Sequence, residues 1–185
     1  MAKRTSTLGP TLLALGAEMG EWNNMDVAFG FPWDMNLEHD AIRETVGMWD
    51  TSALTKIQVH GPDALAAMDY LVTRDMSKIY VGKSAYCPIL KDNGHFCDDG
   101  IAFHVEENHL LLAGSIGPSY ELLQEYVKGK NMTVELDDDL HIITVQGPNS
   151  IDFLDEQTEA NLRDLAFSHQ IHTKVCGVDM MVSRT

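Results

Sequence analysis

The stretch Lys56-Ile57-Gln58-Val59-His60-Gly61-Pro62-Asp63 gives the first clear indication of the fold. Apolar and polar residues alternate up to His60, which is typical of a strand with one buried face. Gly61 and Pro62 then end the strand, and proline suits the first turn of a helix because its missing N–H is not needed there. Apolar residues follow at helical spacing, namely Leu65, Met68, Leu71 and Val72. We therefore predict a strand over residues 56–60 that leads directly into a helix.

The next segment has the pattern of an antiparallel sheet. Strands are predicted over residues 85–90, 95–105 and 109–113, separated by the turn sequences Lys91-Asp92-Asn93-Gly94 and Glu106-Glu107-Asn108. A helix over 118–127 and a strand over 133–136 follow. The order β-α-β-β-β-α-β predicts a compact α+β unit over residues 56–136, with its helices on one face of an antiparallel sheet.

The flanking segments have weaker patterns. Upstream, we predict a short helix over 11–19, an extended segment over 26–32 and a second helix over 36–45. Downstream, Ile143-Thr144-Val145-Gln146-Gly147-Pro148 repeats the frame Ile-x-Val-x-Gly-Pro of residues 57–62. We interpret this echo as two strand-to-helix turns with the same chemistry, because a true repeat normally has at least three copies.

The composition is that of an acidic globular chain of 185 residues. It has 13 Lys+Arg against 28 Asp+Glu, a formal net charge of −15, and 44% hydrophobic residues. Nucleic-acid binding requires a basic face, and so does attraction to an anionic membrane surface. No apolar run approaches the roughly 18 residues that a membrane-spanning helix needs. We expect neither nucleic acid nor a membrane as partner.

The cysteines and the amino terminus indicate a reducing compartment. Cys87, Cys97 and Cys176 are odd in number and include no Cys-x-x-Cys, which favours free thiols over a disulfide framework. Gly9 and Pro10 interrupt the short apolar stretch near the start, so a signal peptide is not indicated. The expected location is the cytoplasm.

Histidine offers little support for a metal site. His169 and His172 form the one close pair, and three-residue spacing can place both on one helix face. No glutamate follows them in a zinc-protease arrangement. A solvated helix end explains the pair better, and we predict no metal.

Asp98-Asp99 is the most unusual feature, because carboxylates are depleted in strands and this pair lies inside a strand pattern. Adjacent strand residues face opposite sides, so only one of the two can point into a given cavity. Two interpretations stay open. Both acids can be solvated at a hairpin edge, or one can lie in an apolar cleft and handle a proton near neutral pH.

A longer series of motifs runs through the chain in a fixed order. It comprises residues 39–43, 47–52, 59–65, 73–78, 145–149 and 182–185, together with Tyr86, Asn93-Gly94 and Asp98-Asp99. The series resembles the amino-terminal half of the glycine cleavage T-protein (aminomethyltransferase) family, which includes related tetrahydrofolate-dependent demethylases. The resemblance extends from about His39 to Thr185.

The resemblance implies an α+β, T-protein-like folate-binding fold. Residues 56–136 would be an inserted ferredoxin-like domain, and residues 1–55 with 137–185 a first, incomplete domain. The family continues into a carboxy-terminal β-barrel that is absent from this chain, so a second chain or a missing segment is the expected source of it. Apolar residues on both faces of the pattern over 178–182 also predict a strand inside a sheet.

The resemblance further implies tetrahydrofolate as cofactor, with its N5 accepting an aminomethyl or methyl unit. Asp99 matches the family's catalytic Asp near N5, and Asp98 would be its outward neighbour. The family's folate-contacting positions correspond to Leu54, Tyr86, Asp99, Ala113 and Ser115. The one-carbon donor would be a small molecule or a lipoyl protein.

Departures from the family pattern leave the donor open. Ala53 replaces the usual His, Leu54 the usual Met and Ser115 the usual Asn, and Gly100 rather than a bulky aliphatic residue follows Asp99. These changes weaken the case for a lipoyl-bound donor, whereas a demethylase tolerates them. Alternatives are a folate-binding iron–sulfur maturation or assembly protein without transferase activity, and a non-catalytic subunit of a demethylating complex. The presence of Asp99 favours transfer.

Overall fold

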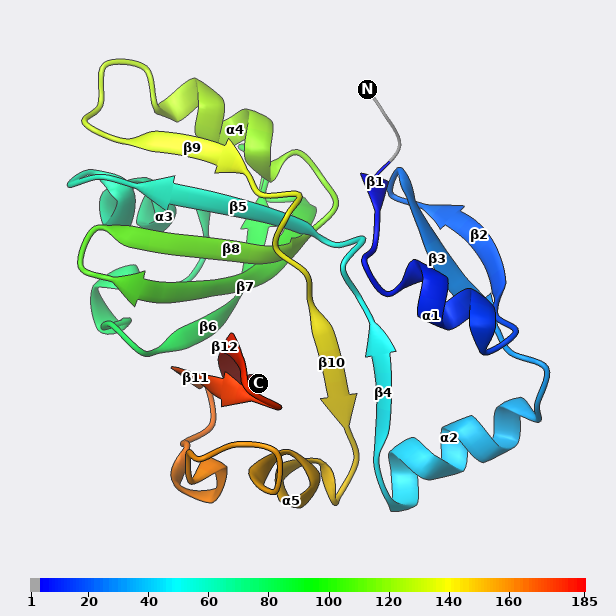
Figure 1. Cartoon of the computed structure of the whole chain (residues 1–185). Coiled ribbons are helices and arrows are strands. Elements are labelled where there is room, and N and C mark those ends of the chain that lie inside the picture. The colour runs from blue at the N-terminus through cyan, green and yellow to red at the C-terminus, as the bar shows by residue number, and fades with distance from the viewer. Residues whose placement is uncertain (1–3) are drawn as a thin grey trace. The chain divides into compact units, whose positions relative to one another are not determined.

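The computed structural model describes residues 4–185, which form two compact units. The first unit comprises the chain up to Ala53, residues 139–164 and residues 173–180. The second unit comprises residues 54–138, 165–172 and 181–185. Figure 1 shows the order of the elements along the chain.

The second unit contains a five-stranded antiparallel sheet. Its elements are β5 (Thr55–His60), α3 (Ala64–Leu71), the 3-10 turn η1 (Met76–Lys78), β6 (Ser84–Leu90), β7 (Phe96–Glu106), β8 (His109–Ser115), α4 (Ser119–Tyr126) and β9 (Thr133–Leu136). The strands lie in the order β6-β7-β8-β5-β9, and neighbouring strands are antiparallel. The predicted order of elements is confirmed. Its description as an inserted ferredoxin-like domain stays a prediction.

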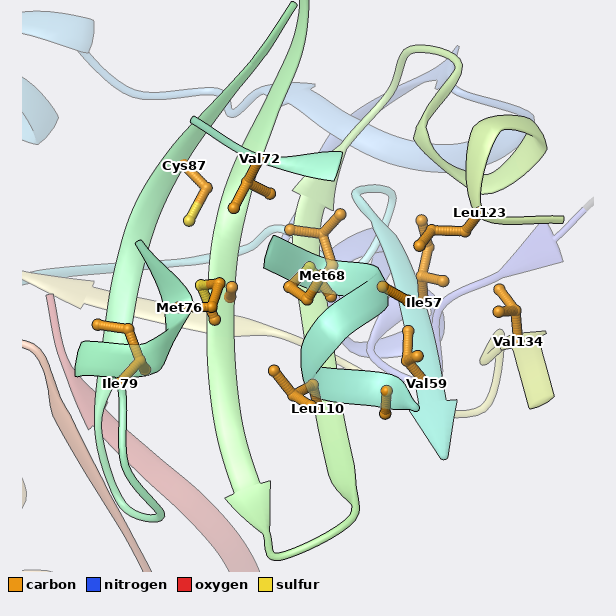
Figure 2. Close-up of a cluster of buried hydrophobic side chains, with 14 of the residues drawn as sticks. Ile57, Val59, Met68, Val72, Met76, Ile79, Cys87, Leu110, Leu123 and Val134 are labelled. Carbon is orange, nitrogen blue, oxygen red and sulfur yellow. The ribbon is translucent and has the colours of Figure 1, made fainter. Parts of the chain in front are cut away.

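The hydrophobic core of this unit lies on one face of the sheet (Figure 2). Ile57 and Val59 of β5 are fully buried there, as the alternation in the sequence predicted. They share the cluster with Met68 of α3 and Leu123 of α4, which are also buried. Both helices therefore cover the same face, and the alternate residues of each strand point to the opposite face.

The first unit contains two further sheets. One has the order β1-β3-β2, from β1 (Arg4–Thr5), β2 (Glu18–Trp22) and β3 (Met25–Gly30); the other pairs β4 (Gly47–Asp50) with β10 (Ile143–Gln146). Its helical elements are α1 (Gly9–Ala14), α2 (Met35–Glu44), α5 (Ser150–Asp155) and the 3-10 turn η2 (Leu162–Asp164). The helix predicted over 11–19 is too long, because Gly16 adopts a left-handed φ of 84° and the chain then enters β2.

Two predictions about the last fifty residues are wrong. His169 and His172 lie on a strand, β11 (His169–Val175), and not on a helix. The strand β12 (Val178–Arg184) forms a two-stranded sheet with β11 and lies inside no larger sheet of the described residues. Its first three residues are exposed, so the apolar pattern there does not mark a buried strand.

The two Ile-x-Val-x-Gly-Pro stretches have the same backbone geometry. Gly61 and Gly147 have φ values of 123° and 127°. A Cβ on Gly61 would lie 2.4 Å from the carbonyl oxygen of Asn131, and a Cβ on Gly147 would lie 2.4 Å from that of Thr45. Only glycine fits either turn, because the conformation and the close backbone approach both exclude a side chain.

The correspondence extends well beyond these turns, at a constant offset of 86 residues. β10 pairs with β4 in the register in which β5 pairs with β9, so that Ile143↔Asp50 corresponds to Ile57↔Leu136. The bridge Thr158↔Val175 likewise corresponds to Val72↔Ile89. The interpretation of the echo as two isolated turns is therefore too narrow, since whole segments of the chain are repeated.

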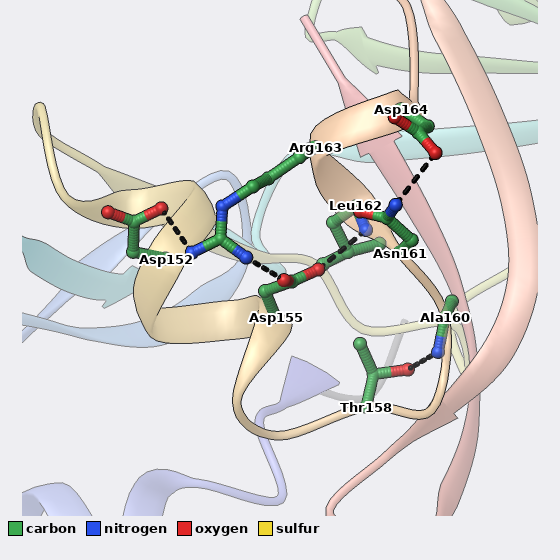
Figure 3. A network of polar contacts seen from close by, with 8 residues as sticks. All are labelled: Asp152, Asp155, Thr158, Ala160, Asn161, Leu162, Arg163 and Asp164. Atoms are coloured by element: carbon green, nitrogen blue, oxygen red, sulfur yellow. Dashed lines mark hydrogen bonds and ion pairs between the residues drawn. The ribbon is translucent and has the colours of Figure 1, made fainter.

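The same offset relates two carboxylates that anchor a turn. Oδ1 of Asp155 accepts a hydrogen bond from the N–H of Leu162 at 2.6 Å, and Oδ1 of Asp69 accepts one from the N–H of Met76 at 2.7 Å. Figure 3 shows the Asp155 copy, in which Arg163 also bridges Asp152 and Asp155. Each carboxylate satisfies an N–H at the start of a 3-10 turn that would otherwise lack a partner within the turn.

Within residues 4–185, every helix falls short of the length and apolar character needed to cross a membrane.

Candidate functional site

The candidate site lies on the face of the five-stranded sheet that α3 and α4 leave open. Strand register places four residues in one row across this face: Tyr86 opposite Ile101, Ile101 opposite Ala113, and Ala113 opposite Lys56. Ile57, next to Lys56, points into the helix-covered core. The row therefore lies on the other side of the sheet.

Asp99 joins this row through Tyr86. The Tyr86 hydroxyl donates a hydrogen bond of 2.7 Å to Oδ2 of Asp99, which lies two residues before Ile101 on β7. The hydrogen bond to Asp99, then desolvation and the negative charge of Asp99, raise the pKa of the Tyr86 phenol above its usual value. Asp99 is half-buried, whereas Tyr86 is 51% exposed. The pair therefore presents an oriented carboxylate and an oriented phenol hydroxyl at the accessible surface.

Asp98 is not the outward neighbour that the sequence suggested. It is 4% exposed and points to the helix-covered side, at the amino-terminal end of α4. The explanation in which both acids are solvated is therefore wrong. Its carboxylate accepts hydrogen bonds from the hydroxyls of Ser115 and Ser119 and from the backbone N–H groups of Asp99, Ile116, Gly117 and Ser119. Burial acts to raise the pKa of Asp98, but the hydrogen bonds from these partners outweigh it, and the pKa is lowered.

Ser115 belongs to the Asp98 cluster and not to the Tyr86 row. Alternation from Ala113 would place Ser115 on the open face, but Gly114 has a φ of 108° and changes the direction of the strand. The Ser115 side chain is 1% exposed and donates to Oδ2 of Asp98 at 2.5 Å. Its predicted contact with folate stays a prediction, and its contact in this structure is with Asp98.

The remaining predicted residues differ in position. Ala113 is in the row, between Ile101 and Lys56, and it is buried, with 8% of its surface exposed. Leu54 lies just before β5 and outside the row, and it is half-buried. The structure thus brings Tyr86, Asp99 and Ala113 onto one face and directs Ser115 to Asp98 on the other.

Lys56 is a residue that the sequence reasoning missed. Its side chain is 1% exposed although it carries an ammonium group, and it makes polar interactions. Lysine is almost never fully buried without a partner. Alternation with Ile57 was the available signal, because it places Lys56 on the face of Tyr86 and Ala113.

Among the described residues, neither a metal site nor an activated thiol stands beside the Tyr86–Asp99 pair as a second candidate site. In the part of the chain that the structure describes, no group of three or more His, Cys, Asp or Glu side chains is arranged to hold a metal ion. The cysteines are free, as predicted. Cys87 is fully buried, and desolvation raises the pKa of its thiol, which makes it a poor nucleophile.

Comparison with known proteins agrees with this fold. Residues 8–185 match the family described as GCVT N-terminal domain. The chain is 38% identical over 182 residues to the heme-dependent oxidative N-demethylase gamma subunit of Ectopseudomonas mendocina (strain ymp), covering 98% of this chain and 48% of that protein. It is 32% identical over 189 residues to the aminomethyltransferase of Koribacter versatilis (strain Ellin345), covering 98% and 50%.

A solved structure shows the same fold. The glycine cleavage system aminomethyltransferase T from Bartonella henselae superposes with a TM-score of 0.83 at 22% identity, covering 93% of this chain and 48% of that one. The chain spans about half the length of the curated relatives it matches. The match over residues 8–185 assigns this chain to the glycine cleavage T-protein family, through its amino-terminal domain.

Proposed function

We propose that this chain is a tetrahydrofolate-dependent one-carbon transferase, or the amino-terminal part or subunit of one. Its relatives are named aminomethyltransferases and an N-demethylase subunit, which supports transfer of a one-carbon unit. The observation that carries the proposal is the Tyr86–Asp99 pair on the open face of the sheet.

The chemistry of this pair fits a reduced pterin. Such a ring presents several N–H donors along one edge, and Asp99 offers carboxylate oxygens at a half-buried place where a hydrogen bond to charge is strong. The exposed ring of Tyr86 offers a flat apolar surface beside it, and Ala113 adds a small apolar side chain to the same row. Tyr86, Asp99 and Ala113 are therefore the residues that we assign to the cofactor.

Tetrahydrofolate, when bound, would supply the secondary amine that accepts the one-carbon unit. Asp99 would orient the cofactor and stabilise the positive charge that develops during transfer, because its carboxylate is already fixed in place. Tyr86 would hold that carboxylate in one orientation through its 2.7 Å hydrogen bond. A group that acts on developing charge contributes mainly to turnover and less to binding.

For the donor, we propose a small N-methylated molecule in preference to a lipoyl protein. The relative at 38% identity is named as a subunit of an N-demethylase, and Ala53 replaces the histidine usual in the family, which weakens the case for a lipoyl-bound donor. We also propose that a carboxy-terminal β-barrel, supplied by a further segment or a second chain, completes the site. The relatives extend to about twice the matched length, and one is itself named as a subunit.

The test compares Asp99→Asn with the unchanged protein, each with the barrel present. We expect tetrahydrofolate to bind both with similar affinity in titration calorimetry, while kcat for one-carbon transfer falls on the order of 10²-fold or more in the variant. Asp92→Asn, in the hairpin turn before β7, is the matched control and should keep the parental kcat. Equal turnover of Asp99→Asn and parent, with normal folate binding, would show that Asp99 has no catalytic role.

A further inference from the structure

The buried carboxylate of Asp98 has no place in the proposed chemistry, yet it accepts six hydrogen bonds. Burying a carboxylate is costly unless its charge is satisfied by donors. Gly117 makes room for it, since a Cβ there would lie 2.7 Å from the Asp98 carboxyl carbon. The segment between β8 and α4 is thus shaped around this group.

One of these hydrogen bonds leads directly to the candidate site. Oδ1 of Asp98 accepts the backbone N–H of Asp99 at 2.9 Å. The registered pairing of β7 with β8 begins at Ile101 and Ala113, so Asp99 lies beyond that ladder. On the other side, Asp99 pairs with Pro88 of β6, whose carbonyl oxygen accepts the N–H of Thr73 and so points away from β7. The carboxylate of Asp98 thus binds the Asp99 N–H beyond the end of the β7–β8 pairing.

We propose that Asp98 is a positioning residue for Asp99: by joining the backbone of Asp99 to Ser115, Gly117 and Ser119, it fixes the direction in which the Asp99 carboxylate leaves the sheet. Asp98 itself does not touch the substrate, because its side chain leaves the opposite face of the strand. The two neighbouring acids therefore have separate tasks. The inference deepens the proposed function, because it assumes that the orientation of Asp99 matters for transfer.

A direct readout of this orientation is the ionisation of Tyr86. The Tyr86 hydroxyl reaches Asp99 only while the Asp99 carboxylate points toward it, and this contact raises the pKa of Tyr86 above its ordinary value. The pKa can be followed by carbon-13 NMR of ζ-labelled tyrosine in the intact protein, with Tyr86→Phe identifying the signal. No folate is needed, so the readout is independent of the proposed activity.

In Asp98→Asn we expect the Tyr86 pKa to fall toward its ordinary value, because an amide holds the surrounding donors less firmly. Asp69→Asn is the matched control: it removes a carboxylate that anchors the N–H of Met76 in the same unit but does not touch Asp99. It should lower stability and leave the Tyr86 pKa unchanged. A folded Asp98→Asn variant with the parental Tyr86 pKa would overturn the proposal.

If Asp98→Asn does not fold, Ser119→Ala decides. Ser119→Ala removes one hydroxyl donor from Oδ2 of Asp98 and keeps the charge of the carboxylate. A smaller fall of the Tyr86 pKa is therefore expected, and an unchanged value contradicts the proposal.

In the transfer assay, Asp98→Asn should lower kcat about 10-fold or more with little change in KM. If Asp99→Asn is inactive while Asp98→Asn turns over normally, the positioning role fails and the proposed function stands. If Asp99→Asn is fully active, the catalytic role assigned to Asp99 fails regardless of the NMR result.

Discussion

Tyr86 and Asp99 are diagonal neighbours on adjacent antiparallel strands, and their side chains meet in a hydrogen bond of 2.7 Å on the open face of the sheet. Diagonal pairs lie within reach of an aromatic side chain, so strand register alone brings the two groups together. No loop has to close to form this contact. The orientation of the carboxylate is therefore present before any ligand binds.

This relationship makes Tyr86→Phe informative, since the change removes the hydroxyl and keeps the ring. We expect kcat for one-carbon transfer to fall roughly 10-fold, because Asp99 loses the donor that holds its orientation, while folate affinity changes little. Tyr70→Phe is the control, as Tyr70 is exposed on α3 and stacks on Tyr126 away from this face. A weaker folate affinity with unchanged kcat would instead assign Tyr86 to binding alone.

The Asp98 cluster predicts a specific dependence of stability on pH. The folded-state pKa of Asp98 is lowered below 3.8, so the unfolded chain binds the proton more tightly than the folded one. The stabilisation is therefore complete well above about pH 4 and is lost as the pH falls through the folded-state pKa. Urea unfolding from pH 7 down to pH 3 should show this loss. Asp98→Asn should be less stable by about 2 kcal/mol at pH 7 and should show a flatter decline in acid.

The repeated glycine turns predict equal sensitivity at two distant positions. Gly61→Ala and Gly147→Ala should each lower the free energy of unfolding by about 2 kcal/mol or more, because a Cβ meets a backbone oxygen at 2.4 Å in a left-handed conformation. Gly94→Ala is a control with a positive φ of 80° and open space around it, and it should cost about 1 kcal/mol. Chemical denaturation of the three variants measures the difference. Comparable losses at all three positions would mean that φ strain, and not the close approach, dominates.

The thiols should differ in reactivity toward a disulfide reagent. Cys176 is exposed and should react first, half-buried Cys97 more slowly, and fully buried Cys87 only on unfolding. Timed labelling followed by peptide mapping distinguishes the three sites. Early labelling of Cys87 in the native protein would show that β6 opens readily.

The five-stranded unit could be predicted from the sequence because its strands and helices have the residue spacing typical of each element and are bounded by recognisable turn sequences. The roles of Asp98 and Asp99 could not. Alternation says that neighbours face opposite sides, but which one faces the helices depends on the register with β6 and β8, and a shift of one residue would exchange them.

Two other features were hidden for a different reason. Ser115 is directed to Asp98 by the φ of a single glycine, and glycine in a strand signals an irregularity without saying where the next side chain goes. Residues 165–172 join the second unit through backbone contacts, such as Ser84 N–H to the Ser168 carbonyl at 2.8 Å. Backbone hydrogen bonds leave almost no trace in side-chain identity, so residue patterns could not reveal this attachment.

The 86-residue offset also provides a natural reference within one molecule. In one copy, the hairpin between β6 and β7 is five residues long and leads into the acidic pair; in the other, β11 and β12 are joined by Cys176 and Gly177 alone. The second copy keeps the glycine turn, the anchoring carboxylate and the strand bridge without carrying that pair. The glycine turn, the carboxylate and the bridge thus belong to the repeated scaffold, and the acidic pair distinguishes the first copy from the second. One molecule thus offers two matched turns, one with and one without the acidic pair, whose stabilities can be compared under the same conditions.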